Sequence, residues 1–430
     1  MSDRSDRVYA CIDLKSFFAS VECVERGLDP MTARLAVADP DREEATICLA
    51  ITPAMKRLGI KNRCRVFEIP EGTKYIMAKP RMKLYMEKSA EIYSVYLKYI
   101  SPDDIHVYSI DECFIDLTPY LKLYHKSPRE LVKLLMSEVK LSTGIPSSAG
   151  IGTNLFLAKV ALDILAKRAE DGIAELDEAR FTEKISHHRP ITDIWNIGEG
   201  TARELAHMGI YDLAGVRGAT EKNLYRKFGV NAEYLIDHAY GRESCTIADI
   251  KKYKPRATSI SHSQVLFRPY SFAEAELILS EMVEVSVLEM VEKRLSCDSI
   301  SLSVGYNHTG RYGSDSYFVP RPTGTARRLS GRTNSLKRIS EHFADIYRIT
   351  TDRDIPVRRL AIGLGNLIDE RYVDTDMFTD VTALNREHAL LEAIVDIKGK
   401  YGKNAIVKGS SFEEHSTARM RNKLVGGHNG

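Results

Sequence analysis

Two short stretches of this chain place acidic side chains at the ends of apolar runs that favour β-strands. In the first, Asp13 follows a run that ends at Ile12, and in the second, the adjacent Asp111 and Glu112 follow Ile110. Buried charge is costly unless it is paired or binds a metal ion. Three carboxylates that converge from two neighbouring strands form a site for a hard cation such as Mg²⁺, which takes further oxygens from a substrate, usually from phosphates. The pattern therefore predicts a metal site made of these three side chains.

The length and composition are typical of a protein with several globular domains. At 430 residues the chain is too long for one core, which predicts two to four domains. Charged residues make up 28% of the chain and hydrophobic residues 43%, and the formal net charge is only +2. The overall charge does not indicate a nucleic-acid partner, so the distribution of charge along the chain is more informative.

Two basic runs without any acidic residue lie in the C-terminal half. One spans 251–268 and the other spans 321–338. One such run is equally well explained by a solvated face, but two in one region favour a surface that follows a phosphate backbone. The candidate DNA contacts in these runs are Lys251, Lys252, Lys254, Arg256, Arg327, Arg328 and Arg332.

The cysteines and the hydropathy restrict the class of protein further. Seven cysteines are scattered without a C-x-x-C pair, which argues against a zinc site and against a secreted disulfide framework. No apolar run reaches the length of about 18 residues that a membrane span needs, and the polar start at 1–7 has no signal-peptide core. We therefore expect a cytoplasmic protein without a membrane segment.

The order of the predicted elements favours an α+β fold with a ferredoxin-like core. A strand at 8–13 is followed by a helix at 16–25, and after an insertion the acidic hairpin spans 105–117. A helix at 128–142 and a strand at 147–151 complete the order β-α-ββ-α-β. We expect an antiparallel sheet with helices on one face, which leaves the other face free for substrate and for the three acids.

The two acidic stretches resemble the signatures of the Y-family, or translesion, DNA polymerases. Residues 13–22 resemble D-x-[DN]-x-F-[FY]-A-x-V-E, and residues 109–116 resemble S-I-D-E-[AC]-[FY]-x-D. The resemblance covers about residues 8–365, and the end of the chain, 417–428, resembles the tail of UmuC-like members from Gram-positive bacteria.

The resemblance implies a right-hand polymerase with a palm, small fingers, a helical thumb and the little finger that only this family carries. The expected boundaries are 1–14 and 80–172 for the palm, 15–79 for the fingers, 173–242 for the thumb, 243–255 for a linker, 256–366 for the little finger and 367–430 for a C-terminal tail.

In the expected thumb, the segment around Gly198 and Gly200 resembles a helix-hairpin-helix, which holds a DNA phosphate on backbone N–H groups at a helix N-terminus. Asn196 stands where the family usually has the first glycine. A structural αα-hairpin without a DNA contact is the alternative for this segment.

The resemblance also implies a metal-ligand set. Asp13, Asp111 and Glu112, with the backbone carbonyl of Leu14, would hold two Mg²⁺ ions about 3.5–4 Å apart. One ion would act on the primer 3′-hydroxyl, and the other would bind the triphosphate and the leaving pyrophosphate. The alternative is that these acids simply pair with lysines.

Nucleotide contacts are expected from five residues. Phe18 matches the steric gate, a ring that leaves no room for a 2′-hydroxyl, and Phe17 lies beside it; core packing is the alternative for either ring. Lys167 matches a family lysine that reaches the phosphates. Where many members have Tyr-x-Ala-Arg, this chain offers the hydroxyl of Thr52 and the point charge of Lys56.

The implied function is that of a template-directed, error-prone DNA polymerase that performs translesion synthesis past damaged bases. No segment is left over for a proofreading exonuclease, and a DNA-damage or SOS response is the expected context. Primer–template DNA and dNTPs are the expected partners. Residues 374–378 resemble a sliding-clamp peptide that lacks the usual Gln.

Two alternatives stay open. A nucleotidyl cyclase shares the palm topology and two-metal chemistry, but it acts on one nucleotide and needs no DNA-binding half. A non-catalytic DNA-binding relative would have lost at least one of the three carboxylates, and none is lost here.

Overall fold

The computed structural model describes residues 7–40, 46–254, 259–307, 321–373, 380–425 and 428–429. The chain divides into two compact units, one of Met1–Lys254 with His428–Gly430 and the other of Pro255–Gly427. Arg256 and the clamp-like peptide at 374–378, both predicted to bind partners, lie outside the described residues. Over the described ranges, no helix is both long and apolar enough to span a bilayer.

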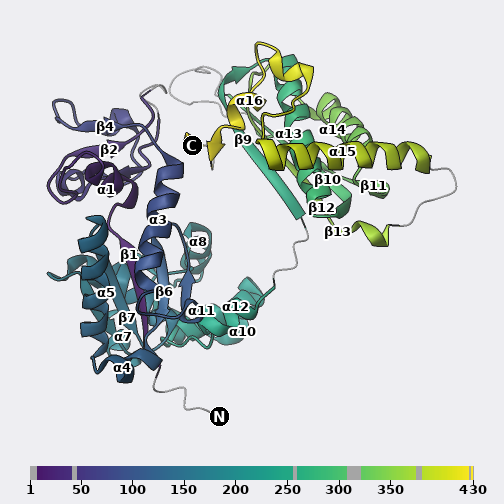
Figure 1. Ribbon diagram of the computed structural model, residues 1–430. Coiled ribbons are helices and arrows are strands. Elements are labelled where there is room, and N and C mark those ends of the chain that lie inside the picture. The colour runs from purple at the N-terminus through teal and green to yellow at the C-terminus, as the bar shows by residue number, and fades with distance from the viewer. Residues whose placement is uncertain are drawn as a thin grey trace, which may run out of the picture. The chain divides into compact units, whose positions relative to one another are not determined.

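A five-stranded sheet lies at the centre of the first unit (Figure 1). In spatial order its strands are β5 (Ile105–Val107), β6 (Glu112–Asp116), β1 (Tyr9–Leu14), β7 (Ser147–Gly152) and β8 (Ile173–Leu176). The first four have the predicted ferredoxin-like arrangement. The sheet was expected to be antiparallel throughout, but β8 pairs with β7 in parallel. The reason is the helical crossover between them, which returns the chain to the same end of the sheet.

Helices cover parts of both faces of this sheet. They are α1 (Phe17–Val24), α3 (Met82–Tyr96), α4 (Thr118–Tyr124), α5 (Pro128–Thr143) and α6 (Leu155–Val160). Ala10 and Ile12 of β1 point to a core shared with α1, α3 and α5, whereas Cys11 and Phe114 point to the opposite face and pack on α6. The expectation of a free second face was therefore wrong, because the β7–α6–β8 crossover places a helix there.

The chain between α1 and α3 forms a small separate sheet. Its order is β3 (Ala50–Ile51), β2 (Leu35–Val37) and β4 (Ile76–Ala78), and helix α2 (Pro53–Arg57) follows β3. Cys48, Ile51 and Met55 are fully buried in a core of its own. This is part of the insertion that the sequence predicts between the helix at 16–25 and the acidic hairpin at 105–117.

Helices follow the five-stranded sheet in the first unit. They are α7 (Glu178–Lys184), α8 (Glu199–His207), α9 (Leu213–Gly218), α10 (Glu221–Phe228), α11 (Asn231–Ala239) and α12 (Ile247–Lys252). A polar linker was expected over 243–255, but α12 lies within it and its Ile247 is buried. A capping box explains the helix, since the Thr246 hydroxyl accepts the N–H of Asp249 at 3.2 Å and the Asp249 carboxylate accepts the N–H of Thr246 at 3.1 Å.

The second unit holds another sheet covered by two helices (Figure 1). Its strands are β11 (Ala326–Thr333), β10 (Leu295–Tyr306), β12 (Val357–Gly365) and β9 (Ser259–Tyr270) in that order, with β13 (Ile368–Asp369) beside β10. Helices α13 (Phe272–Glu292) and α14 (Leu336–Thr350) share a core with the sheet. Strand β11 was not predicted, because its arginines and glycine hide the alternation of apolar residues.

The C-terminal segment packs on this second unit. Helix α15 (Val381–Tyr401) lies beside α13, and its Leu391 is buried in the core of the unit (Figure 1). Near α16 (Ala418–Arg421), Thr417 donates its N–H and its hydroxyl to the buried Glu281 of α13, each at 3.2 Å. The chain ends with β14 (Leu424–Val425) and β15 (His428–Asn429). The segment 380–421 is thus an ordered layer of this unit.

Candidate active site

The three predicted acids lie where β1 and β6 end side by side. Asp13 of β1 is the cross-strand partner of Glu112 of β6, so both side chains project from one face of the sheet. Asp111 lies in the turn before Glu112, and its carbonyl accepts the N–H of Leu14 at 2.9 Å. The Ser109 hydroxyl donates to Oδ1 of Asp111 at 2.7 Å. The fold therefore brings the acids of the two sequence stretches to one corner of the five-stranded sheet.

The electrostatic environment of Asp13 reflects this crowding. Burial raises the pKa of Asp13, and the negative charges of Asp111 and Glu112 raise it further, to about 7. The positive charges of Lys167 and Lys159 lower this pKa but do not cancel the shift. Carboxylates crowded in this way favour a bound cation, and a set of oxygen ligands suits a hard divalent ion.

Glu112 is held by two groups from the interior of the first unit, Cys11 and Lys159. The Cys11 thiol donates to its Oε1 at 2.9 Å, and the Lys159 ammonium group on α6 donates to its Oε2 at 2.8 Å. Lys159 also pairs with Asp163 at 3.0 Å, and its side chain is only 9% exposed. Burial would lower the pKa of Lys159, but its interactions with Cys11, Asp163 and Glu112 raise it above the ordinary value. Lys159 is therefore a charged, internal counter-ion of Glu112.

These contacts also explain why the three carboxylates do not point to a common position where they could bind one metal ion. Within the described part of the chain, no group of three His, Cys, Asp or Glu side chains is arranged closely enough to hold a metal ion. Glu112 is turned toward Cys11 and Lys159, and Asp111 is turned toward Ser109. Sharing an ion among the three acids requires a rotation of at least one side chain.

Phe18 rests on an aromatic ring from α3. It stacks on Tyr85 with ring centroids 4.6 Å apart and an interplanar angle of 19°. The Tyr85 hydroxyl donates to Oε1 of Glu22 at 2.8 Å, and Arg81 donates to both oxygens of the same carboxylate at 2.9 and 2.8 Å. Phe18 and Glu22 are four residues apart on α1, as Arg81 and Tyr85 are at the start of α3. A ring stack and a salt bridge therefore join the two helices and fix the direction of the Phe18 ring.

Glu22 serves this junction as a buried anion. Burial would raise the pKa of Glu22, but hydrogen bonds from Arg81, Arg26 and Tyr85 outweigh burial and hold the pKa below its usual value. Its side chain is fully buried. The carboxylate is thus ionised and committed to holding α1 against α3.

Two predicted phosphate-binding lysines lie near the acidic corner. Burial lowers the pKa of Lys56 on α2, the charge of Asp13 opposes this shift, and the charge of Lys167 adds to it. Lys167 lies 3.4 Å from Asp163 and is exposed. One cation from the small insertion and one from the crossover after α6 thus act on the same corner as Asp13.

Comparisons with known proteins identify the family. Residues 12–163 match the model of the impB/mucB/samB family, and residues 257–377 match the model of its C-terminal domain. UvrX of Bacillus subtilis (strain 168) is 30% identical over 423 residues, which cover 97% of this chain and 96% of UvrX. The chain belongs to the impB/mucB/samB family.

Other relatives agree with this family. DNA polymerase IV 2 of Halalkalibacterium halodurans is 28% identical over 426 residues, which cover 98% of this chain and 99% of that protein. A solved structure, the Y-family DNA polymerase chimera Dbh-Dpo4(243-245)-Dbh, matches with a TM-score of 0.62 at 19% identity and covers 84% of this chain and 99% of that chain. The predicted membership of the Y family and the predicted polymerase fold are confirmed.

Two predicted nucleotide contacts need correction. Phe17 is only 2% exposed and packs in the palm core, because it occupies the inner face of α1. Thr52 is fully buried, and its hydroxyl accepts the N–H of Leu35 at 3.2 Å. Both residues are used inside the fold, whereas Phe18 is only partly buried.

The helix-hairpin-helix segment shows how Asn196 replaces a family glycine. Asn196 has a φ of 68°, in the left-handed region that glycine favours and asparagine tolerates. Gly198 is the N-cap of α8, and Gly198 and Gly200 are both exposed. The hairpin keeps its turn in spite of the substitution, and contact of its N–H groups with DNA stays a prediction.

The basic residues predicted to contact DNA differ in how they are paired. Lysine side chains at the end of the first unit are exposed, namely Lys251, Lys252 and Lys254. On β11, Arg328 and Arg332 lie 3.6 and 3.3 Å from the buried Asp298 of β10, and Arg327 lies 3.9 Å from Asp345 of α14. Asp298 and Asp345, which lie on neighbouring elements, therefore neutralise part of the positive charge of the run 321–338, although this run contains no acidic residue.

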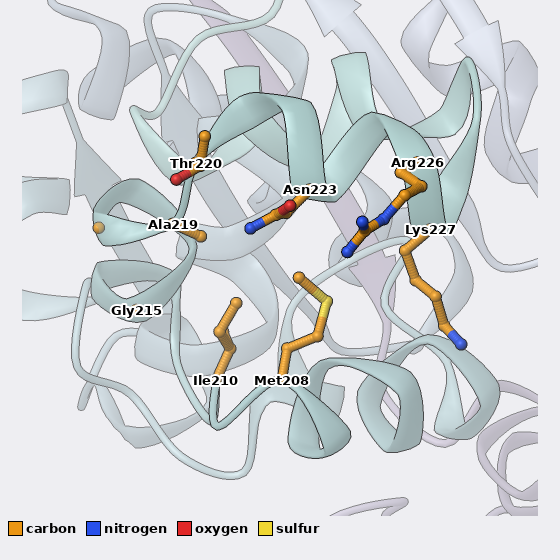
Figure 2. A pocket seen from close by; sticks show the side chains of 9 residues that line it. Met208, Ile210, Gly215, Ala219, Thr220, Asn223, Arg226 and Lys227 are labelled. Atoms are coloured by element: carbon orange, nitrogen blue, oxygen red, sulfur yellow. The ribbon is translucent and has the colours of Figure 1, made fainter.

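A pocket of about 610 Å³ lies away from the acids, among α8, α9 and α10 (Figure 2). Its lining consists of Met208, Ile210, Gly215, Gly218, Ala219, Thr220, Asn223, Arg226 and Lys227. Figure 2 shows Met208 and Ile210 facing Asn223 and Arg226 across the pocket. None of the predicted site residues lines it, so it is separate from the candidate active site.

Sequence reasoning missed the residues that support the site. Lys159 and Asp163 have the i,i+4 spacing of a helical ion pair, but such pairs are usually solvated. The available signal was the context of Lys159 between Leu157–Ala158 and Val160–Leu162, because a lysine among apolar helical residues needs a buried partner. Tyr85 and Arg81 carried no such signal, since their partner Glu22 lies on another helix.

A first prediction concerns the buried pair of Lys159 and Glu112. Lys159→Met should destabilise the first unit by about 3 kcal/mol, because it leaves the carboxylate of Glu112 buried without its counter-ion. Lys133→Met is the matched control, since Lys133 pairs with Asp171 at 3.2 Å but is 53% exposed. That control should cost less than about 1 kcal/mol.

The measurement is urea unfolding followed by the fluorescence of Trp195, the one tryptophan of the chain, which lies in the first unit. If Lys159→Met and Lys133→Met lowered the free energy of unfolding by the same amount, the role of Lys159 as an internal counter-ion would be contradicted.

Proposed function

We propose that this chain is a template-directed, error-prone DNA polymerase that extends primers past damaged template bases by two-metal nucleotidyl transfer. The observation that carries the proposal is the cross-strand pair of Asp13 and Glu112 with Asp111 in the adjoining turn. The family supports it, as do relatives along the full chain that are named DNA polymerase IV 2.

Asp13, Asp111 and Glu112, with the carbonyl of Leu14, would hold two Mg²⁺ ions in this proposal. The residues supply only oxygen ligands from one corner of the sheet, which suits such ions, and a rotation of at least one side chain would gather them. When bound, a pair of divalent ions stabilises the attacking and the leaving oxygens of an in-line displacement.

In this mechanism the protein positions the reacting groups and supplies positive charge near the phosphates. Lys56 and Lys167 place positive charge beside Asp13, where the phosphates of an incoming nucleotide would lie. The N-terminal turn of α1 adds backbone N–H groups that favour an anion. Lys159 donates a hydrogen bond to Glu112 and holds this side chain in one direction until the substrate arrives.

Phe18 would exclude ribonucleotides by occupying the space of a 2′-hydroxyl. Its ring can serve as a rigid wall because Tyr85 supports it from behind and the salt bridge of Glu22 with Arg81 holds the two helices together. The fingers beside it are a three-stranded sheet of short strands with one short helix. A small body of this kind selects weakly for base-pair shape, which is the physical basis for tolerating damaged templates.

Binding of DNA would use the N–H groups around Gly198 and the exposed lysines of 251–254. In the second unit, Arg328 is the most exposed of the three arginines of β11 that we predict to contact DNA, at 80%. Since Asp298 already compensates part of the charge there, the contribution of Arg332 to DNA affinity should be smaller than its position in a basic run indicates.

A second prediction tests the metal ligands. Asp111→Asn should abolish primer extension in the presence of dNTPs and Mg²⁺, because it removes one of three carboxylates that bind the ions, while the retention of primer–template DNA stays unchanged. Gel-based extension and fluorescence anisotropy measure the two properties. Persistent extension would contradict the metal assignment, and extension by neither the wild type nor the variant, with DNA bound, would favour the non-catalytic relative.

A third prediction tests the gate. Phe18→Ala should raise the use of ribonucleotides relative to deoxyribonucleotides by about 10-fold or more, because the steric overlap with the 2′-hydroxyl is removed. Phe17→Leu is the control, since Phe17 lies in the core and should change stability but not sugar selection. Single-nucleotide incorporation kinetics give both values, and an unchanged ratio for Phe18→Ala would place the gate elsewhere.

A further inference from the structure

The single tryptophan of the chain contacts the turn that carries the acids. Trp195 lies three residues before Gly198, the N-cap of α8. Its indole N–H donates to the hydroxyl of Tyr108 at 3.1 Å, and the two rings meet edge to face with centroids 5.9 Å apart. Its ring centroid also lies 5.8 Å from that of Phe114. One side chain of the hairpin segment therefore touches residues on both sides of Asp111.

Tyr108 is the first residue of the acidic turn. Its backbone N–H donates to the carbonyl of Glu112 at 3.0 Å, which closes the turn around Asp111. The ammonium group of Lys159, the counter-ion of Glu112, lies 5.9 Å from the centroid of the Tyr108 ring. A displacement of the Tyr108 ring thus changes the surroundings of both the turn and its counter-ion.

The other attachments of the turn come from the palm itself. Leu14 donates its N–H to the carbonyl of Asp111 at 2.9 Å, and the hydroxyl of Ser89 on α3 donates to the carbonyl of Ile110 at 2.6 Å. A cavity of about 30 Å³ lies beneath the turn, between it and α3. The turn is therefore not fully packed from below, and the contact with Trp195 supports it from a different element.

Trp195 is itself held on the side away from the turn. Its ring lies nearly parallel to that of His238 on α11, with centroids 6.3 Å apart, and His238 stacks on Phe156 at 4.0 Å. His238 also hydrogen-bonds Glu243 at 3.0 Å. A row of packed rings thus runs from α6 and α11 to the acidic turn, with Trp195 at its centre.

We propose that Trp195 is a positioning residue that couples the hairpin at Gly198 to the placement of Asp111 and Glu112, so that DNA binding and metal binding strengthen each other. A phosphate held on the N–H groups at the start of α8 restrains the segment 195–198, and the Trp195–Tyr108 contact passes that restraint to the turn. The inference rests on the proposed function, since it assumes that the hairpin binds DNA and that the acids bind metal.

The test measures the coupling directly. Coupling between two ligands is reciprocal, so Mg²⁺ must raise the affinity for DNA by the same factor by which DNA raises the affinity for Mg²⁺. The probe is a fluorescein-labelled primer–template whose primer ends in a dideoxynucleotide, bound by the full chain with and without Mg²⁺ at matched ionic strength. For the wild type, Mg²⁺ should tighten binding about fivefold or more, and Trp195→Ala should reduce that factor to below about twofold while DNA affinity without Mg²⁺ stays within about twofold.

Milder variants keep the test valid if Trp195→Ala does not fold. Trp195→Phe retains a ring but lacks the N–H donor, and Tyr108→Phe lacks the hydroxyl acceptor. Both should lower the coupling factor to a similar extent, and the double variant should be no worse than either, because the two changes remove one hydrogen bond. Tyr225→Ala, at an exposed aromatic residue of α10, is the control and should keep the wild-type factor.

The outcomes separate this inference from the proposed function. Two results would overturn only the coupling, provided that the wild type binds DNA and extends primers. One is a coupling factor close to one in the wild type, and the other is a factor that stays unchanged in Trp195→Phe and Tyr108→Phe. A wild type that neither binds primer–template nor extends it would overturn the proposed function itself.

Discussion

The arrangement of this protein depends on confining several carboxylates to one corner of a sheet. Asp13 and Glu112 face the same side at paired positions of β1 and β6, and Asp111 lies in the next turn. Burial and mutual repulsion raise the pKa of Asp13 to about 7. Such crowding is unfavourable without positive charge. The surrounding structure supplies part of it, through Lys159 from within and Lys56 and Lys167 from the rim.

The first sequence stretch serves three purposes within ten residues. Asp13 is the last residue but one of β1, Phe18 lies on the first turn of α1, and Glu22 lies one turn later. Because Glu22 binds Arg81 and Tyr85, the helix that carries Phe18 is fixed to α3 at the point where Tyr85 supports the Phe18 ring. A buried salt bridge therefore fixes the helix that carries Phe18 against α3.

The sequence was sufficient for those features that depend on local periodicity and on the family signatures. It predicted the strands that carry Asp13 and Glu112, because short runs of apolar, β-prone residues are typical of buried strands. It failed where a residue's role depends on a distant partner. Thr52 accepts a hydrogen bond from Leu35 on the neighbouring strand, and Arg332 pairs with Asp298 on β10. Neither contact can be inferred from the spacing of residues along the sequence.

Other features were not predicted because they depend on the topology of the fold. Phe17 and Phe18 are adjacent and chemically identical, and only the direction in which α1 meets the sheet buries the first and leaves the second partly exposed. The parallel β8 and the coverage of the second face by α6 follow from the crossover that connects them, which a count of strands and helices does not reveal. Asn196 departs from the family pattern but keeps the same backbone shape, because its φ is positive.

In the proposed function, these carboxylates serve a polymerase that tolerates damage in its template. The most direct measurement is primer extension by the purified full chain on a template with an abasic site, beside the same template without damage. We expect Mg²⁺-dependent extension on both templates. Failure to extend either template while the DNA remains bound would contradict the proposed function.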